Sequence, residues 1–258
     1  MAFKLKKKIK LVLTSCLRML NVVSNLFGLS VVRSRDLISY HLHEYNAYEE
    51  YAKIQVSENV RKIDNVWADE TTLQFISEEI KKYRPQDKEI MGLCHGTRNG
   101  FEQKYFNDTN STFSCIGTDI SETARNYPNS VVHDFHEVKN EWSNKFSFVY
   151  SNSLDHAYDP RKALTAWLDQ LCSEGGLIIE HSQMHSPLAS SKLDPFGVKA
   201  DTLTHLLVNW FGHSVSIKHE DHQRQDGSIS TIFFIKKIMT TTHKDQKNLK
   251  QKKVENDV

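Results

Sequence analysis

Short apolar runs alternate with amphipathic or polar stretches through the middle of the chain. The runs cover residues 89–94, 112–118, 130–133, 146–150 and 176–180, and each is short enough to be a buried strand. Residues 161–172 have apolar side chains at helical spacing, including Leu164, Trp167 and Leu168. Strands that alternate with helices predict a parallel sheet covered on both faces.

The pattern changes after residue 214. Two strand-like runs, 215–218 and 230–235, flank the turn signal Asp226-Gly227-Ser228, which predicts a hairpin and therefore one antiparallel strand. The predicted fold class is α/β, with a doubly wound, mostly parallel Rossmann-like sheet of about seven strands, a final antiparallel strand and an N-terminal helical extension.

The two ends of the chain differ from its middle. Residues 1–35 are a basic, partly amphipathic segment, which favours peripheral contact with an anionic membrane surface or packing as an arm on the main domain. Residues 36–84 are predicted to form a helical lid or cap region, with a helix start near Asp69. Residues 85–237 form the main domain, and residues 238–258 are expected to be a disordered, Lys-rich tail.

Composition narrows the class of protein. The 258 residues are 39% hydrophobic and 25% charged with a net charge of +1, which is typical of a globular domain and predicts no nucleic-acid partner. The four cysteines are scattered without CxxC spacing, which indicates a reduced, cytoplasmic protein and no metal site built on them.

Polar residues follow four consecutive predicted strands, where ligands bind in open parallel sheets. The first strand leads into a turn with Gly96 and Gly100, whose backbone N–H groups can receive an anion. Asp119 follows the second strand and suits a ribose diol, or else caps the next helix. Asp134 follows the third strand and suits an adenine amine, or else is a solvated loop acid. Residues 151–156 follow the fourth.

These strand ends resemble those of the class I S-adenosylmethionine-dependent methyltransferases, and the resemblance covers residues 85–237. Residues 92–100 take the place of the glycine-rich first motif, residues 152–156 are similar to the fourth motif, and residues 175–178 are similar to the fifth-strand signature. The resemblance implies S-adenosylmethionine as cofactor, with binding residues Cys94, His95, Gly96, Arg98, Asp119, Ile120, Asp134, Phe135, Asn152 and Ser153.

The chain departs from this family at the first motif. The family has an acid where Gly92 stands, and glycines where Cys94 and Arg98 stand. Arg98 offers an alternative contact, because its guanidinium can bind the carboxylate of the cofactor directly.

The implied activity is methyl transfer to a hydroxyl of a small-molecule or glycan or lipid-linked acceptor, at the inner face of the membrane. His156 is the candidate general base, unless it only packs against the cofactor, and His181 is a second candidate. The spacing of His181 and His185 would suit a metal only in a helix, so no metal is predicted. Trp67, after Asn59 and Lys62, is interpreted as part of a lid or as a core residue.

Two other functions remain open. A catalytically degenerate methyltransferase-like binding module is consistent with the missing acid at Gly92. An NAD-dependent enzyme would also use an acid after the second strand, but the GxGxxG fingerprint is absent and Asp134 would have no role.

Overall fold

The structure is a computed structural model that describes residues 38–84 and 86–238. Contacts divide the chain after Ser39, and the unit described below begins at Tyr40. The segment 1–35 and the tail 239–258 therefore lie outside the description of this unit, and the predictions made for them stay predictions. Within the described ranges, no helix is both long and apolar enough to cross a membrane.

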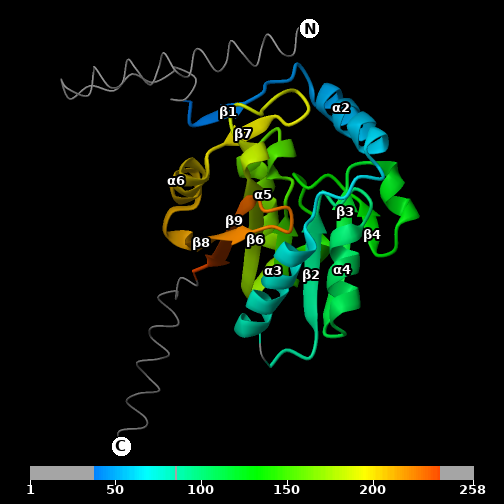
Figure 1. Ribbon diagram of the computed structural model, residues 1–258, viewed down its shortest axis with the longest axis vertical. Coiled ribbons are helices and arrows are strands. Elements are labelled where there is room, and N and C mark those ends of the chain that lie inside the picture. The colour runs from blue at the N-terminus through cyan, green and yellow to red at the C-terminus, as the bar shows by residue number, and fades with distance from the viewer. Residues whose placement is uncertain (1–37, 85, 239–258) are drawn as a thin grey trace, which may run out of the picture. The chain divides into compact units, whose positions relative to one another are not determined.

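A seven-stranded sheet in the order β4-β3-β2-β5-β6-β9-β8 forms the centre of this unit (Figure 1). Its strands are β2 (Ile90–His95), β3 (Phe113–Asp119), β4 (Ser130–Val132), β5 (Phe146–Ser151), β6 (Leu171–Ser182), β8 (Val215–Gln223) and β9 (Ile229–Lys237). The pairs among β2 to β6 are parallel, and β9 is antiparallel to both β6 and β8. The predicted fold class, including the closing hairpin, is confirmed.

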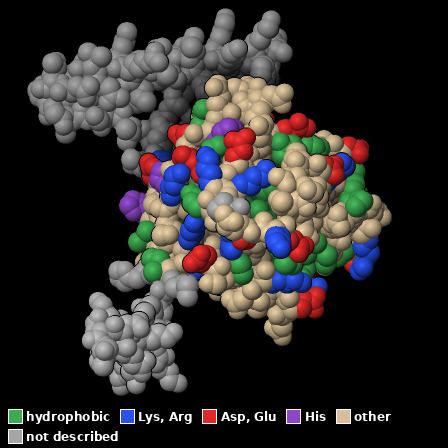
Figure 2. Space-filling view, turned by 90° about the horizontal axis from the view of Figure 1, so that it is seen from below, with side chains coloured by type: hydrophobic (Ala, Val, Ile, Leu, Met, Phe, Trp, Pro, Cys, Tyr) green, Lys and Arg blue, Asp and Glu red, His purple; other side chains and the backbone are tan. Residues whose placement is uncertain are grey.

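Helices cover both faces of this sheet. On one face, α3 (Glu70–Tyr83) and α4 (Phe101–Thr109) pack through residues such as Ile76 and Phe106. On the other, α5 (Pro160–Gln170) and α6 (Ala200–Phe211) pack through Trp167 and Leu207. The face seen in Figure 2 has basic and acidic side chains intermixed.

Local signals explain where α3 and α5 begin. The side chain of Asp69 accepts the Thr72 N–H at 3.0 Å, so α3 begins at the predicted start. Asp159 caps α5 in the same way, and Pro160 occupies its first turn. The predicted helix 161–172 is two residues too long, because residues 171–172 already belong to β6.

The region 36–84 contains one element that helical spacing does not predict. Residues 48–61 form α2 and residues 70–83 form α3, but β1 (Tyr40–Leu42) is a strand. It pairs antiparallel with β7 (Phe196–Val198) in a separate two-stranded sheet. Figure 1 shows α2, β1 and β7 above the carboxyl ends of the central strands.

Gly92 lies where the core has no room for a side chain. A Cβ at this position would lie 2.5 Å from the Sγ of Cys115 and closer still to the ring of Phe148, both of which are buried. We expect Gly92→Ala to lower the free energy of unfolding by about 1–3 kcal/mol, because the packed core must shift. Urea denaturation measures this change.

Gly176→Ala is the matched control, since a Cβ on this strand residue would meet no atom of the described chain within 4 Å. We expect its free energy of unfolding to stay within about 0.5 kcal/mol of the parent. Equal stability of both variants would contradict the close packing at Gly92.

Candidate active site

Two adjoining cavities open at the carboxyl ends of β2, β3 and β5. The larger has a volume of about 640 Å³ and the smaller about 50 Å³. The larger lies within the range of ligand pockets, roughly 300–1,000 Å³. The two cavities adjoin and share five lining residues, which are Lys62, Gly96, Arg98, Ser153 and His156.

The loop after β2 forms the floor of both cavities. Gly96 has a φ of 74°, and a Cβ there would lie 2.6 Å from the Cβ of Ser153, so only glycine fits this turn. The Ser153 hydroxyl donates to the Gly96 carbonyl at 3.3 Å, and the Ser151 hydroxyl donates to the His95 carbonyl at 3.0 Å. These bonds hold the ends of β2 and β5 together.

Asp119 is a buried carboxylate at the end of β3, where its side chain lines the smaller cavity. It accepts the N–H of Arg98 at 3.1 Å and the N–H of Ser121 at 2.9 Å. Burial raises its pKa. Ser121, and not Asp119, caps the short helix 122–126, so the alternative of a helix cap does not describe Asp119. Ile120 lines the same cavity.

Asp134 follows β4 and also lines the smaller cavity, next to Phe135. It accepts the Nδ1 and backbone N–H of His136 at 2.7 and 2.9 Å, and the Tyr48 hydroxyl at 2.7 Å. Burial would raise its pKa, but the bonds from His136 and Tyr48 outweigh this effect and hold the pKa of Asp134 at about 2. It is therefore an ionised, bonded carboxylate, not a solvated loop acid.

Helix α2 closes the smaller cavity from above. Tyr51, Gln55 and Asn59 line it, and α2 contacts three loops, through Tyr48 with Asp134, Gln55 with His156, and Asn59 with Thr123. A volume of about 50 Å³ has room for only a few water molecules. An adenosine group is much larger, so α2 must move outward before such a group can reach Asp119 and Asp134.

The segment between α2 and α3 crosses the mouth of the larger cavity. The Asn99 side chain donates to the Ile63 carbonyl at 3.0 Å, and Arg224 donates to the Trp67 carbonyl at 2.7 Å. Trp67 is 57% exposed and lines this cavity. Its position excludes the alternative of a core tryptophan, and the lid interpretation stays a prediction.

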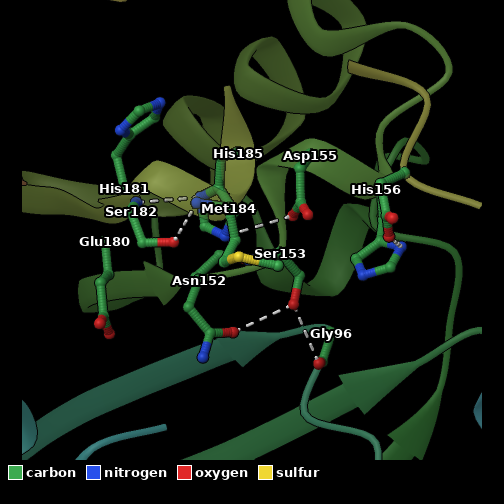
Figure 3. Close-up of polar contacts among 12 residues, drawn as sticks. Gly96, Asn152, Ser153, Asp155, His156, Glu180, His181, Ser182, Met184 and His185 are labelled. Atoms are coloured by element: carbon green, nitrogen blue, oxygen red, sulfur yellow. Dashed lines mark hydrogen bonds and ion pairs between the residues drawn. The ribbon is translucent and has the colours of Figure 1, made fainter. Parts of the chain in front are cut away.

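His156 lies at the end of β5 with its ring on the wall of both cavities (Figure 3). Its Nδ1 is 3.0 Å from the Gln55 Oε1 and 3.1 Å from the Leu193 carbonyl oxygen. Both atoms are acceptors, so Nδ1 carries the ring proton. The neutral ring then has its lone pair on Nε2, which is the form that a general base needs.

Other polar groups line the larger cavity beyond His156. Asn152 and Asp155 follow β5, and His185 stands opposite Asp155 with 3.8 Å between its Nε2 and the Asp155 Oδ1 (Figure 3). Glu180 on β6 is almost fully buried and forms an ion pair with Arg224. None of Asp155, Glu180, His185 and Arg224 was among the predicted cofactor contacts. Asp155 was predicted only as part of the fourth motif, and His185 only as a potential metal ligand.

Two predicted cofactor contacts have side chains outside both cavities. Cys94 packs among α3 and α4, and the His95 ring bonds to Thr118 and Gln170 on the opposite face. Burial lowers the pKa of His95 to about 3. Because β2 is covered on both faces, even its last side chains point into the packed layers, and only backbone atoms of these residues can face a ligand.

His181 does not lie in the position of a base either. Its Nε2 donates to the Val198 carbonyl at 2.9 Å, and burial lowers its pKa to about 4. Figure 3 shows its ring turned away from the other labelled side chains. Nδ1 of His185 accepts the Ser182 N–H at 3.3 Å, so that this pair is not arranged to share a metal.

Comparison with known proteins identifies the fold. No protein-family model and no curated protein sequence matches the chain. Among solved structures, it is similar to the 1,6-didemethyltoxoflavin-N1-methyltransferase of Burkholderia thailandensis with bound S-adenosylhomocysteine, at a TM-score of 0.57 and 16% identity, over 76% of this chain and 92% of that one.

Two further structures agree. The plantazolicin methyltransferase BpumL with S-adenosylhomocysteine has a TM-score of 0.53 and 14% identity, over 74% of this chain and 96% of that one. The N-methyltransferase NodS of Bradyrhizobium japonicum has a TM-score of 0.51 and 12% identity, over 71% and 98%. The chain therefore has the fold of the class I S-adenosylmethionine-dependent methyltransferases.

Proposed function

We propose that the chain binds S-adenosylmethionine and transfers its methyl group to a small molecule or to a glycan or lipid-linked acceptor, at a hydroxyl. One observation carries this proposal. Four separate strand ends line the two adjoining cavities, and they contribute Asp119, Asp134, the Gly96 turn, and Asn152, Ser153, Asp155 and His156. An NAD-dependent enzyme would leave Asp134 without a role.

The residues present fit this cofactor. Asp119 is buried with its carboxylate on the cavity wall and suits two ribose hydroxyls. Asp134 and the backbone of Phe135 suit the adenine edge. The Arg98 Nη1 donates to the Asn65 carbonyl at 3.4 Å, whereas its buried Nε has no hydrogen-bond partner in the described ranges and can donate to a carboxylate.

His156 supplies the chemistry that the chain itself contributes. The bound cofactor provides an electrophilic methyl carbon on a sulfonium. The Leu193 carbonyl does not belong to α2 and can hold the proton on Nδ1 when α2 moves. Nε2 of His156 would then take the proton of the acceptor hydroxyl while the hydroxyl oxygen attacks the methyl carbon and S-adenosylhomocysteine leaves. The cavity walls align the acceptor with the methyl carbon, and this alignment supplies much of the rate.

The acceptor class is tested by label transfer. Purified protein is incubated with methyl-labelled S-adenosylmethionine and, separately, glycan, lipid-linked and small-molecule fractions of cell extract. We expect label in one of these fractions as an O-methyl group, identified by mass spectrometry. Label only on nitrogen would contradict the hydroxyl, and binding without any transfer would favour the degenerate binding module.

The N-terminal segment is the part of the chain that we propose to contact the membrane. Residues 1–35 contain Lys4, Lys6, Lys7, Lys8 and Lys10 followed by an apolar run, and such a segment favours an anionic lipid surface. This position would place the active site at the inner face of the membrane, close to a lipid-linked acceptor.

If α2 moves outward when the cofactor binds, weakening its contacts should change the affinity for the cofactor. In the structure, the Tyr48 hydroxyl donates a hydrogen bond to the Asp134 carboxylate, which we propose as the acceptor for the adenine amine. Tyr48→Phe removes this bond, so α2 opens more easily, and we expect S-adenosylhomocysteine to bind about three- to tenfold more tightly. Calorimetric titration measures the change.

Tyr83→Phe on α3 is the control for Tyr48→Phe, because its ring packs beneath Lys236 and away from both cavities. We expect the affinity of this control to be unchanged. Weaker binding by Tyr48→Phe would contradict the assignment, since it would mean that the hydroxyl contacts the bound nucleoside.

A further inference from the structure

One oxygen of the buried Glu102 carboxyl has no hydrogen-bond partner in the described ranges. Glu102 is the second residue of α4, is only 6% exposed and lines the larger cavity. Its Oε2 is inaccessible to solvent and has no hydrogen-bond partner in residues 38–84 and 86–238. A first-turn acid is ordinarily at the surface, where the helix dipole stabilises it. Burying a carboxyl oxygen without a partner costs free energy unless a ligand supplies the missing partner.

The charges around Glu102 do not offset the cost of burying its ionised carboxylate. Its own backbone N–H and Arg98, in the loop before α4, favour the ionised form of Glu102, whereas Glu180 on β6 and Asp119 on β3 disfavour it. Cys94 on β2 and Tyr150 on β5 also face it. The other Lys and Arg residues of the described ranges that line this cavity, Arg224 and Lys62, are paired with Glu180 and Glu58. Burial dominates and raises the pKa of Glu102 to about 8.

Strand β2 itself provides no acid here. The position at which related methyltransferases carry one is Gly92, and the Phe148 ring and the Cys115 sulfur fill the space that a side chain would need. Glu102 lines the larger cavity from α4, so an acid reaches this cavity from the helix after β2 and not from β2 itself. Arg98, whose backbone is left-handed with a φ of 46°, lines both cavities beside it.

We propose that Glu102 accepts the primary ammonium group of the methionine end of the cofactor, next to an Arg98 that receives its carboxylate. The carboxylate of Glu102 and the guanidinium of Arg98 lie on one wall of the cavity and match the ammonium and the carboxylate of an amino-acid group. This inference rests on the proposed function, because it assumes that the cavities hold S-adenosylmethionine.

The proposal predicts that cofactor binding releases a proton. In the free protein at pH 7 most Glu102 carboxyls are protonated, because the pKa of about 8 lies above this pH. An ammonium partner requires the ionised form, so the proton must leave when the ligand binds. Affinity for the ligand should accordingly rise as the pH increases from 6 to 8, and the dependence should flatten above pH 8.

The experiment compares two ligands by calorimetry at pH 7 in buffers of different ionisation enthalpy. S-adenosylhomocysteine carries the amino-acid group, and 5′-methylthioadenosine lacks it. We expect close to one proton to be released with the former and none with the latter. Since this comparison uses the unaltered chain, it does not depend on the folding of any variant.

Glu102→Gln separates the amino-acid end from the nucleoside end. We expect its affinity for S-adenosylhomocysteine to fall at least about tenfold, its proton release to disappear, and its affinity for 5′-methylthioadenosine to change less than twofold. Glu122→Gln is the control, since Glu122 is an exposed acid paired with Arg125, and it should bind both ligands as the parent does.

Three results would overturn the proposal. One is unchanged S-adenosylhomocysteine binding and proton release in Glu102→Gln. Another is an equal loss of affinity for both ligands, which would show that Glu102 supports the site as a whole. If neither ligand binds to the unaltered chain, the proposed function fails together with the inference, and this result is distinct from the other two.

Discussion

Replacing Asp119 by asparagine should weaken the binding of S-adenosylmethionine by at least about a hundredfold. The buried carboxylate of Asp119 lines the smaller cavity and already accepts the N–H groups of Arg98 and Ser121. Its remaining lone pairs can accept two ribose hydroxyls. Each hydrogen bond to a charged group contributes roughly 1.5–3 kcal/mol, and two of them correspond to a factor of about 100 or more.

Calorimetric titration of Asp119→Asn against the parent measures this effect. Because Asp119 also holds the Gly96 loop through Arg98, thermal unfolding must show that the variant is folded. Asp108→Asn on α4 is the control, since this acid is exposed and paired with Lys104. A folded Asp119→Asn variant that binds within threefold of the parent would refute the role of Asp119 in ribose binding.

Replacing His156 by glutamine should lower kcat by about 10²- to 10⁴-fold and change cofactor affinity by less than about tenfold. The size is that of a lost general base. Glutamine can keep a polar contact with Leu193, but it has no basic nitrogen at the place of Nε2. The measurement is the rate of label transfer to the fraction that becomes labelled in the label-transfer experiment, together with the cofactor Kd.

His205→Gln on α6 is the matched control, because His205 is exposed and lines neither cavity. Its rate should equal that of the parent. If His156→Gln loses less than about fivefold in kcat, then alignment alone drives transfer, and His156 only packs in the site.

The sequence predicts the parallel part of the sheet because the strands from β2 to β6 contain short, largely apolar runs with turn residues near their ends. In β5, for example, Phe146, Phe148 and Val149 are all buried, as expected for a strand covered on both faces. The strands β1 and β7 were not predicted, because three residues such as Tyr40–Leu42 are too few for a periodic signal. Their pairing depends on contacts distant in sequence.

The candidate site was predictable where it depends on topology. Parallel strands bring their carboxyl ends to one edge, so Asp119, Asp134 and His156 could be grouped before their positions were known. The contacts of α2 with the site could not be predicted, because no sequence pattern indicates that a residue such as Gln55 lines a cavity. Glu102 was missed for a similar reason. A first-turn acid resembles a surface residue, and only packing shows that it is buried.

The central claim is that these cavities hold S-adenosylmethionine, and direct calorimetric titration of the purified chain tests it. We predict saturable binding of S-adenosylmethionine with one cofactor per chain, and no binding of NADH under the same conditions. Absence of any binding of S-adenosylmethionine up to high micromolar concentrations would contradict the claim.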